Sequence, residues 1–242
     1  MTARVAVAGR RRGDRAPEER RLDAYAASAA HSIGASVSVV NGYATLLREH
    51  FAEPLGPDGM AVLRGLEGGL GRLRVFMDDL LELAALEART LDPATVDLAS
   101  VAAKAVAGLA GPLDEAGIEV RLGSLPDVTA DRAMLERLFH HLVRGALAAM
   151  AAGPGRIAMS ATCRAAGTRI EVTDTGPPLD PAQAAGLFES FAPPRGSGTA
   201  VGAGVGMAIA RRIAERHGGS IWAHTGRRAG CTIVVLLPES TG

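Results

Sequence analysis

Two stretches in the first third of the chain place apolar residues at alternating steps of four and three, the spacing of a heptad repeat. The first repeat consists of Ala26, Ala30, Ile33, Val37, Val40, Ala44, Leu47 and Phe51. The second consists of Leu63, Leu66, Leu70, Leu73, Met77 and Leu80. Because a heptad repeat keeps one apolar stripe on one side of a helix, each stretch predicts a long helix that packs as in a coiled coil or four-helix bundle.

A break rich in proline and glycine separates the two repeats, at Pro54-Leu-Gly-Pro57-Asp-Gly59. A turn there predicts an antiparallel helical hairpin. Since one hairpin has little core of its own, two copies are predicted to pair into a four-helix bundle, which makes the protein a homodimer. The second helix also contains four glycines: Gly65, Gly68, Gly69 and Gly71. Each costs a helix about 1 kcal/mol relative to alanine, and both close helix approach and local flexibility are open explanations.

Composition excludes several classes of function. The 242-residue chain is 48% hydrophobic and 21% charged, as is typical of a folded globular protein. Lysine plus arginine and aspartate plus glutamate both number 26, and aromatic residues make up 3%. Neither charge nor stacking surfaces therefore indicate a nucleic acid partner. The sequence has no apolar run of about 18 residues and no signal peptide, so we expect a cytoplasmic protein without membrane insertion.

The rest of the chain alternates between the helical period and the strand period. Helices are predicted at 99–116, 132–151 and 180–188, and strands at 95–98, 118–122, 128–131, 156–163, 168–174, 219–225 and 231–237. Asp131 is placed to cap the helix that begins at 132. This mixed order predicts an α+β sandwich, with one sheet and helices on one of its faces.

Three glycines at alternate positions, Gly202, Gly204 and Gly206, lead directly into an amphipathic helix that stops at Gly218. A glycine-rich loop at a helix start lets backbone N–H groups approach an anion, and the helix dipole adds positive potential. The phosphate chain of a nucleotide is the obvious anion. Glycines at a helix start also allow tight packing, so the pattern alone does not distinguish a phosphate-binding loop from a packing contact.

Several segments together carry a resemblance to one family. The segment Ile170-Glu-Val-Thr-Asp174-Thr-Gly176-Pro, the segment Leu187-Phe-Glu-Ser-Phe191 and residues 202–222 resemble the first glycine box, the phenylalanine box and the second glycine box of bacterial sensor histidine kinases. The interval from His31 to Gly42-Tyr43 is similar to that between the phosphoacceptor histidine and its Gly-Tyr pair in the family. The chain from about 22 to 238 thus resembles the catalytic core of these kinases.

Residues 1–20 contain several arginines and no hydrophobic period, which predicts a flexible basic arm. The resemblance implies a dimerisation and histidine phosphotransfer hairpin at 21–90 and an ATP-binding catalytic domain at 91–242. That domain would be of the type shared with gyrase and heat-shock ATPases. With ATP and Mg²⁺ it would phosphorylate His31, which would pass the phosphate to an aspartate on the receiver domain of a response regulator. Residues 192–201 would form a mobile lid, and an upstream sensor protein would supply the signal.

The resemblance also implies roles for residues around the nucleotide. Asp174 would accept a hydrogen bond from the adenine amino group, and Gly176 would let the backbone pass close to the base. The phosphates would be surrounded by Gly202, Gly204 and Gly206.

The chain departs from the family pattern where catalysis would occur. Ser32 replaces the acidic residue after the histidine, and Pro178 replaces the last glycine of the first box. The helix at 132–151 should carry two asparagines, but His141 and Gly145 occupy their positions. Glycine removes an oxygen ligand for Mg²⁺. His141 either contacts a phosphate or transfers a proton, or else it is a partly exposed helix histidine.

Three functions follow from this combination. The leading interpretation is a dimeric histidine kinase of a two-component system with weak or conditional activity. The second is a pseudokinase or phosphotransfer protein, in which His31 receives phosphate from a partner or the hairpin only docks a receiver domain. The third is a nucleotide-sensing scaffold that closes its lid without chemistry.

Overall fold

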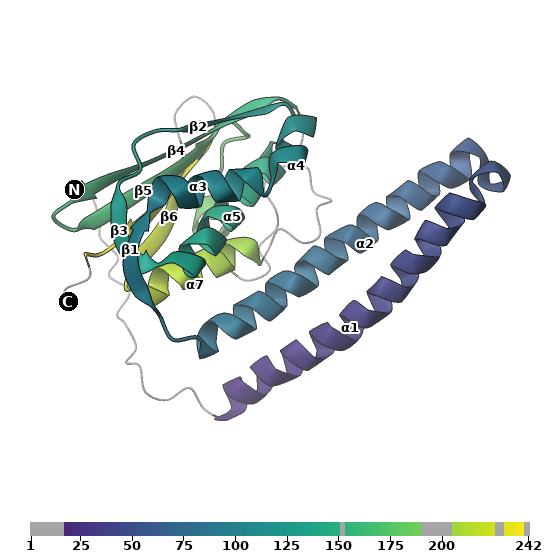
Figure 1. Cartoon of the computed structure of the whole chain (residues 1–242), viewed down its shortest axis with the longest axis horizontal. Helices are drawn as coiled ribbons and strands as arrows, with labels where there is room; N and C mark the ends of the chain where they lie inside the picture. Colours follow the sequence, from purple (N-terminus) through teal and green to yellow (C-terminus); the bar gives the residue numbers. More distant parts are fainter. Residues whose placement is uncertain (1–16, 151–152, 190–204, 226–229, 240–242) are drawn as a thin grey trace.

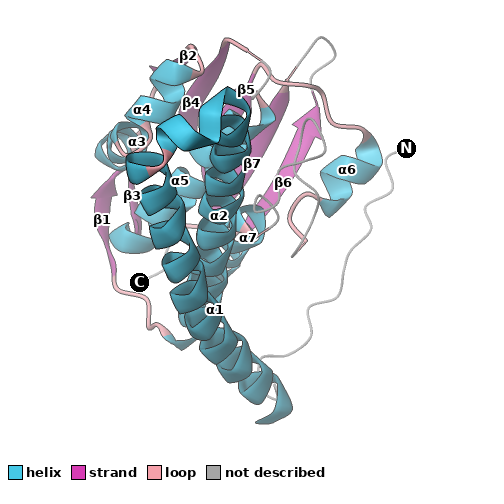
Figure 2. Cartoon of the chain, turned by 90° about the vertical axis from the view of Figure 1, so that its right-hand side faces the viewer, coloured by secondary structure: helices cyan, strands magenta, loops and turns pink. Residues whose placement is uncertain are grey.

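The computed structural model describes residues 17–150, 153–189, 205–225 and 230–239, with the backbone alone described for 17–32, 87 and 88. The chain forms a long helical hairpin and a domain of mixed strands and helices that packs along the second hairpin helix (Figure 1). Figure 2 views the molecule with the hairpin in front and the larger sheet behind it.

The hairpin consists of α1 (Pro17–His50) and α2 (Ala52–Ala88), which lie side by side in opposite directions (Figure 1). Gly56 interrupts α2 near its start with a φ of 63°, which confirms the predicted break. Pro57 then opens the continuous helix, where its missing N–H is not needed. The buried heptad positions are Val37, Ala44, Leu63 and Met77. The exposed heptad positions are Ile33, Val40, Leu47, Phe51 and Leu66.

Five strands form a mixed sheet in the order β2–β4–β5–β7–β6. They are β2 (Ile118–Leu122), β4 (Gly155–Arg164), β5 (Gly167–Asp174), β6 (Ser220–Thr225) and β7 (Cys231–Leu237). The pair β2–β4 is parallel and the other three pairs are antiparallel. In the central strand β5, the last residue, Asp174, lies opposite Ile157 on one side and Cys231 on the other.

A second sheet of two antiparallel strands joins β1 (Pro93–Asp97) to β3 (Asp127–Asp131). The prediction of a single sheet is therefore wrong. In this register Val96 lies opposite Val128, and both are buried. The linker strand thus buries its apolar side chain by pairing with β3, outside the larger sheet.

Helices α3 (Leu98–Ala107), α5 (Arg132–Ala149) and α7 (Gly206–Arg216) cover one face of the five-stranded sheet, as predicted (Figure 1). The helix predicted at 99–116 is divided, because α3 ends at the C-cap Gly108 and a separate α4 (Ala110–Glu115) follows. Glycine is a poor helix former, so the chain bends there. The short α6 (Pro181–Gly186) is the other helix of the domain among the described residues.

The core of the domain is built around α5. Its fully buried side chains are Met134, Leu135, Leu138, Phe139, Leu142 and Val143. They pack in one cluster with Ile157 and Ile170 of the sheet and with Ile209 and Ile213 of α7. At the start of α5, the Asp131 carboxylate accepts a hydrogen bond of 3.0 Å from the backbone N–H of Met134, which confirms the predicted cap.

The end of α2 is part of this domain. Leu86 is 1% exposed and belongs to the domain core, against which Phe76, Leu80 and Leu83 also pack. At the end of α7, the Arg216 guanidinium donates hydrogen bonds to the carbonyl oxygens of Leu86 and Arg89. An arginine at carbonyls that a helix end leaves unpaired satisfies them and so fixes where α2 meets α7.

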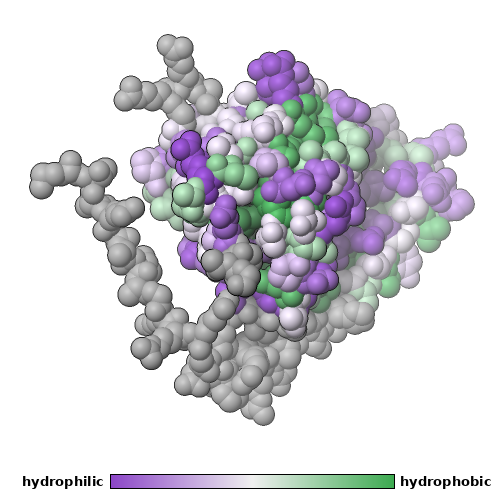
Figure 3. Space-filling model, turned by 60° about the vertical axis from the view of Figure 1, so that its left-hand side comes forward, coloured by the Kyte–Doolittle hydropathy of each residue, from purple (hydrophilic) through white to green (hydrophobic). Residues whose placement is uncertain are grey.

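On the side drawn in Figure 3, hydrophobic and hydrophilic residues of the described part of the chain lie next to one another at the surface. Among the described residues, no helix combines the length and apolar character that crossing a bilayer requires.

Candidate functional site

Asp174 lies at the end of the central strand β5 and is 2% exposed. Its Oδ1 accepts a hydrogen bond of 2.9 Å from the backbone N–H of Gly176. A Cβ atom added at Gly176 would lie 3.0 Å from Asp174 Oδ1, 3.2 Å from Met150 Cγ and 3.3 Å from the Ala149 carbonyl oxygen. Only glycine fits this turn without displacement, so the chain brings a buried carboxylate beside the C-terminal end of α5.

The N-terminus of α7 forms the second part of the site. Val205 precedes α7 as its N-cap and has no side-chain oxygen, so the first-turn N–H groups are not capped by it. A Cβ atom added at Gly206 would lie 2.8 Å from Arg144 Nη2 and 3.0 Å from His141 Nδ1. Two basic side chains of α5 therefore lie against the helix start. Gly202, Gly204 and the predicted lid at 192–201 lie outside the described residues.

Helix α5 connects the two parts. Met150 at its C-cap contacts the Asp174 turn, and His141 contacts the start of α7. Nine residues of helix separate them, which corresponds to about 13 Å along the axis. A nucleotide lying along α5 would therefore have its base near Asp174 and its phosphates near Gly206.

Gly145 stands on α5 where the resemblance predicts an asparagine that ligates Mg²⁺. A Cβ atom added there would lie 2.8 Å from Met207 Cε and 3.5 Å from Met207 Sδ. The first turn of α7 thus fills the space with a thioether, which is a soft and weak ligand. Mg²⁺ prefers oxygen ligands, and α5 offers none at this position. The residues present here do not fit Mg²⁺.

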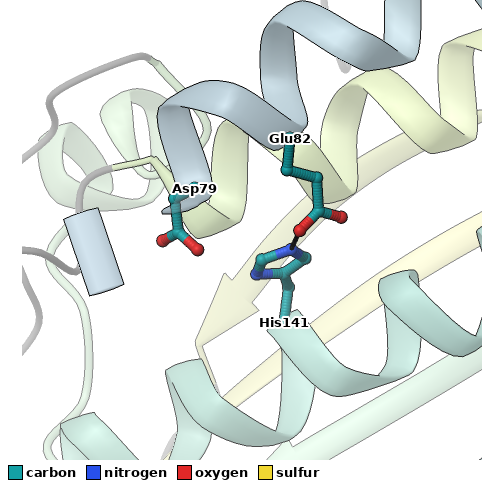
Figure 4. A group of neighbouring side chains, drawn as sticks. All are labelled: Asp79, Glu82 and His141. Atoms are coloured by element: carbon teal, nitrogen blue, oxygen red, sulfur yellow. Dashed lines mark ion pairs between the residues drawn. The ribbon is translucent and has the colours of Figure 1, made fainter. Parts of the chain in front are cut away.

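An ionic cluster joins α2 to α5 next to this position. Arg144 forms an ion pair with Asp79, and the Asp79 side chain is 3% exposed. Arg144 Nη2 also lies 3.1 Å from His141 Nδ1, and His141 Nε2 lies 3.3 Å from Glu82 Oε2 (Figure 4). A guanidinium has no acceptor, so Nδ1 of His141 accepts and Nε2–H points to Glu82. Arg137 Nη1 lies 3.6 Å from Glu82 Oε1.

The expectation that His141 is partly exposed is wrong, because it is 2% exposed. Helix α2 covers this face of α5, which the pattern of α5 alone does not indicate. The sequence analysis also missed Asp79, Glu82 and Arg144, which belong to the cluster. Asp79 and Glu82 are three residues apart on α2, as His141 and Arg144 are on α5, so the sequence places each pair on one helix face. Nothing in the sequence indicates that these two faces meet.

The cluster perturbs the ionisation of its members. Burial opposes the ionisation of Glu82, but the hydrogen bond from His141 and the electrostatic interactions with His141, Arg137 and Arg144 outweigh it and lower its pKa. Burial, followed by the electrostatic interactions with His141 and Arg144, lowers the pKa of His140. The cluster therefore holds a carboxylate ionised between the hairpin and the domain.

Asp79, Glu82 and His141 also have one ligand atom each within 4.8 Å of one another, as a metal site requires. Arg144 already bonds to two of the three, Asp79 and His141. A guanidinium thus supplies the positive charge that balances these carboxylates.

His217 holds the far end of α7 in place. Its Nε2 accepts a hydrogen bond of 3.1 Å from the backbone N–H of Asp131, and its Nδ1 lies 2.8 Å from the carbonyl oxygen of Ile213. His31 lies within α1, but its side chain is outside the described residues.

Comparison with known proteins supports this description. The family described as histidine kinase-, DNA gyrase B- and HSP90-like ATPase matches residues 130–241. The sensor protein CutS of Streptomyces coelicolor is 31% identical over 198 residues, which cover 80% of this chain and 48% of CutS. The phytochrome-like protein Cph1 of Synechocystis is 26% identical, and 29% of its length is covered. The chain thus spans less than half the length of these relatives.

Solved structures match over the hairpin as well as the domain. Full-length ShkA in complex with AMPPNP has a TM-score of 0.67 at 25% identity, covering 91% of this chain and 46% of that one. The histidine kinase ThkA in complex with the response regulator protein TrrA has a TM-score of 0.64 at 21% identity, covering 92% of this chain and 65% of that one. These matches confirm the predicted fold class, a helical hairpin followed by an α+β sandwich of the ATPase type.

Proposed function

We propose that this chain, which carries the catalytic core of a bacterial sensor histidine kinase, binds ATP and transfers its γ-phosphate to His31. The proposal is carried by the placement of two features along α5. The buried Asp174 lies beside the C-terminal end of α5, and Gly206, which starts α7, lies against the middle of α5. This pair provides an acceptor for a purine amino group and backbone donors for phosphates. We assign Gly176 to the base and Gly202, Gly204 and Gly206 to the phosphates.

The transfer would use the lone pair of one imidazole nitrogen of His31, which is available on the neutral ring near pH 7. A bond forms between that nitrogen and the γ-phosphorus, while the bond to the bridging oxygen breaks and its electrons leave with ADP. The proton on the other ring nitrogen is then released. A receiver-domain aspartate of a response regulator would take the phosphoryl group, and the ThkA complex with TrrA supports such a partner. Input would come from an upstream sensor protein.

The hairpin at residues 21–90 would act as the dimerisation unit, ahead of a nucleotide-binding domain at 91–242. Ile33, Val40, Leu47 and Phe51 continue the first heptad stripe and are each more than a third exposed in one chain. Covering such a stripe with a second copy removes apolar surface from water, and this burial favours a four-helix bundle.

Mg²⁺ is the ion expected to accompany ATP, held by phosphate oxygens and water. Because α5 lacks an oxygen ligand at Gly145, we expect weak kinase activity. The glycine at position 145 favours a second candidate function, a nucleotide-sensing scaffold that binds ATP without transferring phosphate.

Incubation with γ-labelled ATP separates these functions. A kinase gives an acid-labile label on the protein, which His31→Ala abolishes while ATP binding is retained. A nucleotide-sensing scaffold binds ATP but acquires no label. A chain that binds no nucleotide at all contradicts the proposal, and leaves only phosphotransfer or docking by the hairpin.

A further inference from the structure

The phosphates of a bound nucleotide need a positive partner at the start of α7. A nucleoside triphosphate carries several negative charges, and a metal ion normally neutralises part of them. Here α5 has glycine at the expected ligand position, and Met207 fills the space. Another positive group near Gly206 can supply part of that charge.

Arg144 is placed to do so. Its Nη2 lies so close to Gly206 that a Cβ atom there would be only 2.8 Å away. Its side chain is 24% exposed, so the guanidinium is partly accessible. A guanidinium matches the geometry of phosphate oxygens with two parallel donors, and the dipole of α7 points positive at the same place.

The same guanidinium has a partner on the hairpin. Arg144 is ion-paired with Asp79 of α2, a residue whose side chain is almost fully buried. The second neighbour of Nη2 is His141 Nδ1 at 3.1 Å. Nη2 has two N–H donors, and Asp79 and His141 take both, so a phosphate that binds at Nη2 must displace one of these partners.

We propose that Arg144 is the cation that binds the nucleotide phosphates in this site, and that Asp79 competes with the nucleotide for it. This inference rests on the proposed binding of ATP. It makes nucleotide affinity largely independent of Mg²⁺. It also couples the site to the hairpin, because a nucleotide that takes Arg144 from Asp79 loosens the contact between α2 and α5. The coupling is reciprocal, so removing the competing carboxylate of Asp79 raises nucleotide affinity.

The test measures calorimetric affinities of the full chain for ATP and adenosine, in EDTA and in Mg²⁺. Wild-type protein should bind ATP in EDTA nearly as tightly as in Mg²⁺. Arg144→Gln should lower ATP affinity by at least about tenfold, the size typical of losing a charge-assisted hydrogen bond, with adenosine affinity unchanged. Asp79→Asn should raise ATP affinity by about fivefold or more, the lower range of site coupling. It should not affect adenosine.

Two further variants keep the result interpretable. Arg144→Gln alone leaves Asp79 buried without its partner, so the double variant Asp79→Asn with Arg144→Gln removes both charges and should bind ATP as weakly as Arg144→Gln. Arg137→Gln is the matched control, because Arg137 also links α5 to α2, through Glu82, but is not among the atoms that crowd Gly206. It should leave ATP affinity unchanged.

The outcomes distinguish the two levels of the proposal. If the wild-type chain binds neither ATP nor adenosine, the proposed function fails and the role of Arg144 fails with it. If it binds ATP but the double variant binds equally well, the proposed function stands and Arg144 is not the phosphate ligand. If Arg137→Gln raises ATP affinity as much as Asp79→Asn does, loosening of the hairpin explains the gain, and competition for Arg144 is refuted.

Discussion

Asp131 caps the central helix of the domain, and its removal should destabilise the domain strongly. Its two oxygens serve different donors. Oδ1 accepts from the backbone N–H of Met134 at 3.0 Å, and Oδ2 accepts from the backbone N–H of Asp92 at 3.2 Å. Arg89 lies 3.4 Å away, and Asp131 is 2% exposed. One side chain thus fixes the start of α5 and the linker that leads from the hairpin.

The magnitude follows from these contacts. Losing an N-cap costs about 0.5–2 kcal/mol, and leaving a second N–H without its acceptor costs about 1 kcal/mol or more. We therefore expect Asp131→Ala to lower the free energy of unfolding by about 2–3 kcal/mol. Asp131→Asn has one acceptor oxygen instead of two, so it keeps only one of the two bonds. Its cost should be about half as large.

Urea unfolding followed by the fluorescence of Trp222 measures this change, because Trp222 is the only tryptophan in the sequence and lies on β6 of the larger sheet. Asp97→Ala is the matched control, since Asp97 caps α3 through Ala99 and Ser100 at an exposed position. It should cost about 1 kcal/mol. A loss below about 0.5 kcal/mol for Asp131→Ala, or equal losses at the two caps, would refute the reasoning.

The same residue predicts a pH dependence. Burial opposes the ionisation of Asp131, but the hydrogen bonds from Met134 and Asp92 and the charge of Arg89 outweigh it and lower its pKa. The stabilisation is therefore complete above the pKa of an unfolded aspartate, about 3.9, and is lost as the pH falls through the lower folded value. Asp131→Asn should remove this part of the acid sensitivity. An unchanged acid profile in that variant would show that other carboxylates account for it.

Three further predictions concern the hairpin and the site. Gly65→Ala and Gly71→Ala should each stabilise the hairpin by about 0.5–1 kcal/mol in thermal unfolding, because nothing lies within 4 Å of a Cβ atom at either position; a loss would instead indicate close packing by a second copy. The lowered pKa of Glu82 means that its contribution is present above about pH 4.3 and is lost as the pH falls through its folded value. Glu82→Gln should reduce the loss of the free energy of unfolding at acid pH, and an unchanged loss would contradict this prediction. The double variant Gly145→Asn with Met207→Ala should make ATP affinity dependent on Mg²⁺ in calorimetry. Gly145→Asn alone should have a smaller effect, and equal effects of the two variants would show that Met207 does not obstruct position 145.

Local signals predicted most of the secondary structure. The strand patterns gave β4 and β5 nearly residue by residue, and Asp131 marked the start of α5 correctly. Such features depend on side-chain period and on capping within a few residues, which the sequence contains directly. The division of α3 from α4 was missed, although Gly108 was there to indicate it.

Contacts between distant segments were the part that the sequence did not reveal. The separate sheet of β1 and β3 depends on which strand the linker meets, and alternation within 93–97 does not specify a partner. The burial of His141 depends on α2, which precedes it by more than fifty residues. For the same reason nothing in the sequence singles out Asp79 and Glu82, which only the fold brings to Arg144 and His141.

The two glycines of the site are best understood as a pair. Met207 of α7 enters the space at Gly145 of α5, and the basic side chains of α5 lie against Gly206 of α7. Each helix thus lacks a side chain where the other supplies one, so α5 and α7 pack closely at this point. Met207 therefore fills the place where the family resemblance predicts an asparagine at 145. An anion at the start of α7 would consequently lie next to the Arg144 guanidinium, because both ring nitrogens of His141 already have partners.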